Sequence, residues 1–225
     1  MDVALIPAFN EEETIYEVVT RAKRIGLTPI VIDDCSKDRT SELARKAGAI
    51  VLKHERNKGK GEAIKTGFNF LKNLDGVKHV VLLDADLQYL PEDSLNLLLP
   101  LREDRVDIVF GCRDFRKIPL RHRLGNWVWR NSFNLFFRTN FKDTNCGLVA
   151  LTREAIEKVK DGLQGGYIVE NSILVQALRN NLKVRQAPVR VYYKKKSSFL
   201  RGIRVVLGVL IFILKEGLKF RLKRI

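Results

Sequence analysis

Two carboxylates separated by one small residue are the clearest chemical signal in this chain. Asp84 and Asp86 flank Ala85 directly after the apolar run at residues 79–83, and Gln88 follows two positions later. In a turning segment, side chains at positions i and i+2 can reach one point. Carboxylate and amide oxygens are the ligands that Mg²⁺ and Mn²⁺ prefer in proteins. We therefore predict a divalent metal site at Asp84, Asp86 and Gln88, with water and phosphate oxygens completing the coordination.

Polar and aromatic residues also follow three other apolar runs of strand length, at residues 3–6, 29–32 and 107–110. The residues after these runs include Pro7, Phe9, Glu11, Asp34 and Arg113. Phe9 offers a face for a nucleobase, Asp34 could accept a hydrogen bond from a ring nitrogen, and Arg113 could pair with a phosphate. Helix capping by Asp and Asn is the simpler explanation for any single position, but it explains all four strand ends together poorly.

The elements that must position these residues alternate between strand and helix. Strands are predicted at 3–6, 29–32, 49–52, 79–83, 107–110, 147–151 and 183–192. Helices are predicted at 11–25, 38–47, 60–74, 92–103, 153–160 and 169–180, and from 198 onward, with part of 115–145 also helical. This alternation predicts an α/β domain with a mostly parallel sheet. Because ligands collect at the carboxyl ends of such strands, we expect these polar residues in one site.

Charge and cysteine content narrow the function classes. The 225 residues carry a formal net charge of +15, and residues 190–225 hold eleven Lys or Arg against the single acid Glu216. A basic end of this kind suits an anionic membrane surface, a nucleic acid or a phosphorylated acceptor. Three widely spaced cysteines cannot form a disulfide framework and indicate reduced thiols of an intracellular protein. The first residues show no basic leader, so we expect no signal peptide.

The absence of several motifs argues against assigning the chain to other classes of protein. Residues 57–61 (Asn-Lys-Gly-Lys-Gly) lack the order of a P-loop, and no GxGxxG dinucleotide fingerprint occurs. A nucleotidyltransferase is an alternative, but residues 7–12 (Pro-Ala-Phe-Asn-Glu-Glu) replace its usual glycine-rich, lysine-bearing loop. A nucleic-acid-binding module is disfavoured because the basic residues accompany a long apolar run and the aromatic residues form no stacking array.

Four motifs together resemble glycosyltransferase family 2. They are residues 7–12, 33–40 (Asp-Asp-Cys-Ser-Lys-Asp-Arg-Thr), 84–88 (Asp-Ala-Asp-Leu-Gln) and 111–113 (Gly-Cys-Arg), in the order and spacing of that family. The resemblance spans about residues 1–200 and is nearest to the dolichyl-phosphate mannose synthase group. It implies the Rossmann-like glycosyltransferase-A fold and a GDP- or UDP-linked sugar donor. It also implies inversion at the anomeric carbon and transfer to polyprenyl or dolichyl phosphate.

The resemblance also implies roles for individual positions. The nucleotide-binding positions are Pro7, Phe9, Glu11, Ile32, Asp34, Asp84 and Ala85. The metal positions are Asp84, Asp86 and Gln88, for Mg²⁺ or Mn²⁺, and the catalytic positions are Asp86, Arg113 and Glu170. The acceptor-phosphate positions are Arg121, Arg123, Lys194, Lys195 and Lys196, and the alignment does not choose between the two arginines. Phe9 replaces the usual tyrosine of the family, which keeps the stacking face but removes a hydroxyl.

The residue after Glu170 bears on the acceptor. Family members that glycosylate a sugar hydroxyl usually have Asp there as a base, whereas this chain has Asn171. A hydroxyl needs a base because proton removal accompanies attack. A phosphate monoester, with a second pKa of ~6, is already largely dianionic at pH 7. Asn171 therefore favours a lipid phosphate over the alternative, a saccharide hydroxyl.

The end of the chain is predicted to contact a membrane. We expect a catalytic domain at 1–197 and a basic amphipathic helix at 198–225. Residues 205–214 carry no charge, but as a helix they are only about 15 Å long. A helix of this kind suits an anionic interface rather than a span. We therefore expect a peripheral enzyme on the cytoplasmic face. The alternative is a helix packed on the domain or on a dimer partner, and a homo-oligomer remains open.

Overall fold

A seven-stranded sheet organises the chain. The computed structural model describes residues 1–103, 106–117, 120–192 and 199–222, and the statements below concern these residues. The strands are β1 (Asp2–Ala8), β2 (Thr28–Asp33), β3 (Ile50–Lys53), β4 (His79–Leu82), β5 (Ile108–Arg113), β6 (Val149–Thr152) and β7 (Val184–Val189). Their order is β3-β2-β1-β4-β6-β5-β7, and β6 alone runs antiparallel to its two neighbours. The predicted mostly parallel α/β sheet is confirmed.

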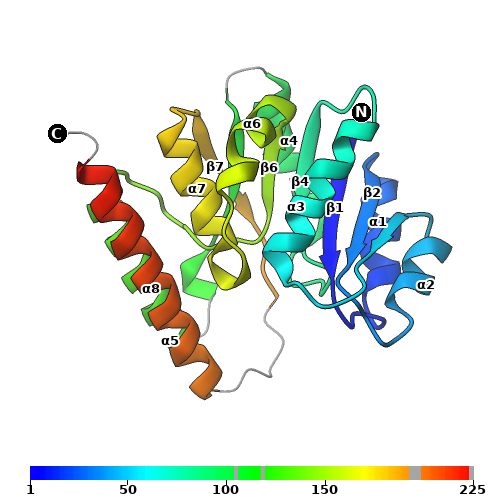
Figure 1. The fold of residues 1–225 in the computed structure, drawn as a ribbon, viewed down its shortest axis with the longest axis horizontal. Coiled ribbons are helices and arrows are strands. Elements are labelled where there is room, and N and C mark those ends of the chain that lie inside the picture. Colours follow the sequence, from blue (N-terminus) through cyan, green and yellow to red (C-terminus); the bar gives the residue numbers. More distant parts are fainter. Residues whose placement is uncertain (104–105, 118–119, 193–198, 223–225) are drawn as a thin grey trace.

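Helices cover both faces of this sheet (Figure 1). They are α1 (Ile15–Arg24), α2 (Thr40–Lys46), α3 (Lys60–Phe70), α4 (Ser94–Arg102), α5 (Leu120–Phe137), α6 (Arg153–Val159), α7 (Val169–Arg179) and α8 (Phe199–Leu222). One buried apolar cluster joins the sheet to α3, α5, α6, α7 and α8, and a second joins it to α1, α2 and α4. Strand side chains alternate between the two clusters, as the period of two requires. The apolar runs that became the five inner strands reflect burial on both faces, whereas β3 and β7 at the sheet edges are partly exposed.

Several predicted boundaries were wrong, including those of the first helix and the last strand. The first helix begins at Ile15 instead of residue 11, because Asn10 adopts a positive φ of 55° and residues 12–14 form a turn. In that turn the carbonyl of Glu11 accepts hydrogen bonds from the amides of Thr14 and Ile15. The last strand ends at Val189. Beyond it, the chain pairs locally with the segment after β4, since the amide of Tyr192 donates to the carbonyl of Gln88.

The last helix packs along α5 at one end of the molecule (Figure 1). The indole Nε1 of Trp129 donates to the carbonyl of Val206 at 3.0 Å. Gly217 of α8 lies so close to α5 that a Cβ there would be 2.6 Å from the Cβ of Phe136. The α8 side chains Val209, Phe212, Ile213 and Phe220 join the core cluster. This face of α8 therefore packs on the domain, as the alternative to a membrane-bound helix predicted. The predicted domain boundary between residues 197 and 198 lies outside the residues that the structure describes.

Candidate active site

One cavity of about 600 Å³ gathers most of the residues singled out in the sequence. Its lining includes Pro7, Phe9, Glu11, Asp34, Asp84, Ala85, Asp86, Gln88, Arg113 and Glu170. These residues come from the ends of β1 and β5, from the segments that follow β1, β2 and β4, and from α7. The cavity therefore lies at the carboxyl edge of the sheet, where the α/β architecture places ligands.

Other predicted residues lie elsewhere. Ile32 is fully buried in β2 and does not line the cavity, because the strand alternation turns its side chain into the core cluster. Arg123 is exposed on α5 and is not part of the lining. The side chain of Arg121 and all of residues 194–196 fall outside what the structure describes, so their acceptor role stays a prediction.

The two aspartates of the predicted metal site lie in a tight turn after β4. Leu87 has a positive φ of 58°, a conformation that costs energy for a residue other than glycine. It lets the amide of Gln88 donate to Asp86 Oδ1 at 3.0 Å. Asp84 lies directly against Gly147, where an added Cβ would be 2.3 Å from Asp84 Oδ2. A side chain at this position would therefore displace the Asp84 carboxylate.

This turn suits a hard divalent cation that keeps part of its coordination for other ligands. Asp84, Asp86 and Gln88 all face the cavity. Within the described residues there is no group of three or more His, Cys, Asp or Glu side chains that could hold a metal by itself. Two carboxylates and an amide are the oxygen donors that Mg²⁺ takes from a protein when water and substrate phosphates supply the rest. The residues present therefore fit the predicted cofactor.

Asp34 connects the cavity to the loop that precedes α3. Its Oδ1 accepts hydrogen bonds from His54 Nδ1 at 2.7 Å and the amide of Lys58 at 2.8 Å, and its Oδ2 accepts from the amide of Gly59 at 2.7 Å. Burial raises the pKa of Asp34, but these hydrogen bonds outweigh it and lower the pKa below its usual value. Since the carboxylate only accepts, His54 Nδ1 carries the proton, and Nε2 can accept from Thr66 Oγ1 at 2.9 Å.

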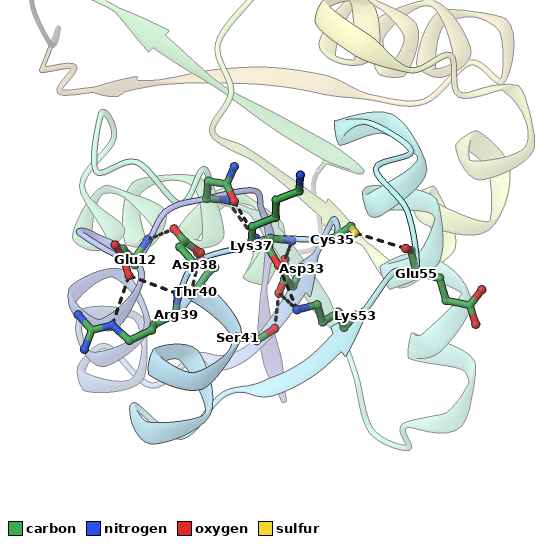
Figure 2. A network of polar contacts seen from close by, with 12 residues as sticks. Glu12, Asp33, Cys35, Lys37, Asp38, Arg39, Thr40, Ser41, Lys53 and Glu55 are labelled. Carbon is green, nitrogen blue, oxygen red and sulfur yellow. Dashed lines mark hydrogen bonds and ion pairs between the residues drawn. The ribbon is translucent and has the colours of Figure 1, made fainter.

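A polar network holds the segment after β2 against the segment after β1 (Figure 2). The amide of Glu12 donates to Asp38 Oδ2, and the amide of Arg39 donates to Glu12 Oε2, both at 3.2 Å. In the same network, the fully buried Asp33 accepts from the amide of Ser36 and from the hydroxyl of Ser41. These hydrogen bonds hold together the two loops that carry the predicted nucleoside contacts, one after β1 and one after β2.

Arg113 is buried, and Asp143 and Asn126 orient its guanidinium. Its Nε and Nη2 donate to the two oxygens of Asp143 at 2.6 and 2.8 Å, and Nη2 also donates to Asn126 Oδ1 at 3.0 Å. Such a bidentate pair fixes the guanidinium plane. Arg113 therefore enters the cavity as a preorganised cation whose charge is partly balanced by Asp143.

A lysine that was not singled out joins the two halves of the site. Lys60, the first residue of α3, places its Nζ 2.7 Å from Asp84 Oδ1 and 2.8 Å from Glu170 Oε1. Burial opposes its charge, but the two carboxylates raise the pKa of Lys60 well above its usual value. Lys60 is therefore an ammonium at neutral pH. By contrast, Asn171 is fully buried, does not line the cavity, and its side-chain Nδ2 and Oδ1 have no hydrogen-bond partner.

Comparison with known proteins identifies the family. Residues 3–159 match the family described as Glycosyl transferase family 2. The chain belongs to glycosyltransferase family 2. It is therefore a glycosyltransferase, and its sheet is that of the glycosyltransferase-A fold. The predicted family, fold and enzyme class are thereby confirmed, whereas the roles of individual site residues are not tested by this match.

Relatives cover nearly the whole chain. An uncharacterized protein of Methanocaldococcus jannaschii, MJ0544, is 32% identical over 97% of this chain and 98% of its own length. The UDP-N-acetylglucosamine–dolichyl-phosphate N-acetylglucosaminyltransferase of Methanococcus voltae is 30% identical, covering 92% of each chain. Glucosyl-3-phosphoglycerate synthase from Mycobacterium tuberculosis, solved with Mn²⁺, UDP and glucosyl-3-phosphoglycerate, superposes with a TM-score of 0.75 over 96% of this chain and 80% of its own. At 20% identity, that last likeness shows the fold alone.

Several lining residues escaped the sequence reasoning. They are Ala8, Gly59, Lys60, Ala63, Tyr89, Trp129, Asn145, Gly147, Gly166 and Val205. Lys60 carried a usable signal, because it starts a predicted helix after a predicted strand, but residues 57–61 were weighed only as a P-loop. Asp143, which orients Arg113, lies in the polar stretch before β6. Trp129 and Val205 had no local signal, because they reach the cavity only through the packing of α5 on α8.

Proposed function

We propose that this enzyme transfers a sugar, with inversion, from a nucleotide-sugar to the phosphate of a polyprenyl or dolichyl phosphate, using Mg²⁺ or Mn²⁺. The observation that carries the proposal is that a single cavity contains both the predicted metal site and an apolar wall. Asp84 and Asp86 line it together with Trp129 of α5 and Val205 of α8. A phosphorylated lipid combines an anionic head with an apolar chain, and this cavity combines charged groups with an apolar wall. The name of the relative from Methanococcus voltae includes dolichyl phosphate.

The donor side follows from the residues at the strand ends. Phe9 is 44% exposed within the cavity lining and offers an accessible ring face for a nucleobase. Asp84, Asp86 and Gln88 would hold the cation, which when bound would neutralise the departing nucleoside diphosphate. Arg113, held by Asp143, would add a fixed positive charge for phosphate. The proposal assigns the protein mainly positioning and electrostatic roles.

The acceptor side depends on the absence of a dedicated base next to Glu170. Asn171 is buried away from the cavity, and the carboxylate of Glu170 is already hydrogen-bonded to Lys60. A lipid phosphate is anionic at pH 7 and can attack the anomeric carbon without a base. A saccharide hydroxyl would need one. The arrangement therefore favours the phosphate acceptor.

The outer face of α8 supports a peripheral place on an anionic, cytoplasmic membrane face. The side of α8 opposite its packed face exposes a row of apolar side chains, here called the α8 stripe: Leu207, Ile211, Leu214, Leu218 and Leu222. Exposed Lys215 and Lys219 flank the stripe, and α5 adds exposed Leu124 and Trp127. No described helix is long and apolar enough to cross a membrane. An apolar row with basic neighbours suits a helix that lies in the interface.

A donor panel tests the proposal. Radiolabelled UDP- and GDP-sugars are each incubated with the full-length enzyme and polyprenyl phosphate in anionic vesicles, with Mn²⁺, Mg²⁺ or EDTA. We expect lipid-extractable label from one donor, loss with EDTA and recovery with excess metal. Asp86→Asn should abolish transfer, while Asp75→Asn, which changes an exposed aspartate outside the cavity, should not. Label on a free saccharide with none on the lipid phosphate would overturn the proposed acceptor.

A further inference from the structure

The side chain of Lys60 bridges two carboxylates that the proposed reaction needs for different purposes. Its Nζ lies 2.7 Å from Asp84 Oδ1, a predicted metal ligand, and 2.8 Å from Glu170 Oε1, a predicted catalytic group. These two acids lie 86 positions apart in the chain, so only the fold brings them together. One ammonium therefore serves as the shared counter-ion of two carboxylates in the cavity.

The backbone holds Lys60 at this point. On one side, the amides of Lys58 and Gly59 are fixed by the carboxylate of Asp34. On the other side, a Cβ on Gly61 would lie 2.2 Å from the Cα of Gly165, so the start of α3 is in direct contact with the loop before α7. Residues 58–61 are thus held between Asp34, which follows β2, and the loop before α7, so the backbone position of Lys60 is fixed.

This placement has an electrostatic consequence for metal binding. A divalent cation that binds Asp84 would lie within a few ångströms of the Lys60 ammonium, where like charges repel strongly in a partly buried site. Asp84 Oδ1 cannot give its full charge to both cations. Occupation of Asp84 by metal and by Lys60 should therefore be mutually antagonistic.

We propose that Lys60 is the resting counter-ion of Asp84 and Glu170, and that a divalent cation must displace its ammonium from Asp84 in order to bind. This inference rests on the proposed function in taking Asp84 as a metal ligand. The anionic diphosphate of a donor gives the displaced ammonium a new partner, so it favours the exchange. The enzyme then binds metal weakly alone and tightly together with nucleotide, and Lys60 acts as a positioning residue that couples the two.

Direct Mn²⁺ titration tests this inference without any turnover. Free Mn²⁺ is followed by its electron paramagnetic resonance signal as it is added to nucleotide-free, full-length protein. We expect Lys60→Met to bind Mn²⁺ on the order of tenfold more tightly than the wild type, because the competing charge is gone. Lys60→Arg, which keeps the charge, should stay within a few fold of the wild type. Lys58→Met is the matched control, since Lys58 is an exposed lysine on the same loop.

A second arm measures the coupling. UDP or GDP should tighten Mn²⁺ binding by a larger factor in the wild type than in Lys60→Met. Because Lys60→Met leaves two carboxylates without their cation, its melting temperature should be lower without metal and should rise more with Mn²⁺ than that of the wild type. This Mn²⁺-dependent rise reports the same competition if the variant is too unstable to titrate at 25 °C.

The outcomes separate this inference from the proposed function. Equal Mn²⁺ affinity and equal Mn²⁺-dependent stabilisation in the wild type and Lys60→Met would overturn it, as would an equal gain in Lys58→Met. If Lys60→Met gains affinity but the wild type transfers no sugar to lipid phosphate, the competition stands and the proposed reaction fails. If transfer is metal-dependent but Mn²⁺ affinity does not respond to Lys60→Met, the reaction stands and the competition fails.

Discussion

Membrane attachment through the α8 stripe can be tested by removing two of its side chains. Ile211 and Leu218 lie two turns apart on α8 and are 63% and 56% exposed. Neither belongs to the core cluster that holds α8 on α5. The double substitution Ile211→Ser and Leu218→Ser should therefore weaken membrane binding without unfolding the helix. Deleting α8 would be a poorer test, since deletion would expose the buried face of α5.

The expected magnitude follows from these exposures. Together the two side chains present slightly more than one full aliphatic side chain to solvent. Burying one such side chain is worth about 2 kcal/mol. The membrane partition constant should therefore fall about 30-fold, given a factor of ten for every ~1.4 kcal/mol. Basic residues near the stripe should leave a residual binding that decreases at high salt.

Vesicle flotation of the full-length protein measures this change. The matched control is Leu95→Ser with Leu99→Ser on α4, where the side chains are 41% and 59% exposed and so present nearly the same apolar area. The control should float like the wild type on anionic vesicles. If the stripe variant also floats like the wild type, or if both double variants lose the same fraction, the α8 stripe is not the membrane-binding surface.

Three further changes have defined outcomes. Gly147→Ala places a methyl group against the first carboxylate of the metal site and should lower kcat/KM about 100-fold, whereas Gly208→Ala, which meets nothing within 4 Å, should leave transfer kinetics unchanged. Asp34→Asn should lower the free energy of unfolding by about 2 kcal/mol at pH 7. Because the folded pKa of Asp34 is lowered, that gap should shrink as pH falls below 3.8 in urea titrations. Asp143→Ala removes the buried carboxylate that pairs with Arg113 and should cost about 3–5 kcal/mol, measured by urea unfolding.

The sequence predicted the sheet and the gathering of the site because both depend on local patterns. Each of the apolar runs predicted to be a strand became one, and strands that run in parallel must end at one edge. Asp34, Asp84 and Arg113 therefore met in one cavity although they are far apart in the chain. Ile32 was misplaced as a lining residue because its motif gave its position along β2 but not which face of the sheet its side chain occupies.

The contacts that were missed depend on long-range geometry. Lys60 meets Glu170 because Gly61 lets α3 approach the loop before α7, and no pattern near either residue encodes that approach. The amphipathic pattern of α8 indicated an apolar face but not what would cover it. In the structure α5 covers one side, and Trp129 reaches the cavity through this packing. Partner choice between two amphipathic helices is a tertiary property that the period of one helix does not determine.

Competition between two lipids tests the central claim most directly. Vesicles containing equal amounts of polyprenyl phosphate and polyprenol are incubated at pH 7 with the enzyme, Mn²⁺ and the labelled donor selected by the panel, and the lipid products are separated. The two lipids differ only in the phosphate group. The phosphate can attack without a catalytic base, whereas the hydroxyl of polyprenol would need one. We predict label on the lipid phosphate alone. Comparable label on polyprenol would contradict an acceptor site built for a phosphate.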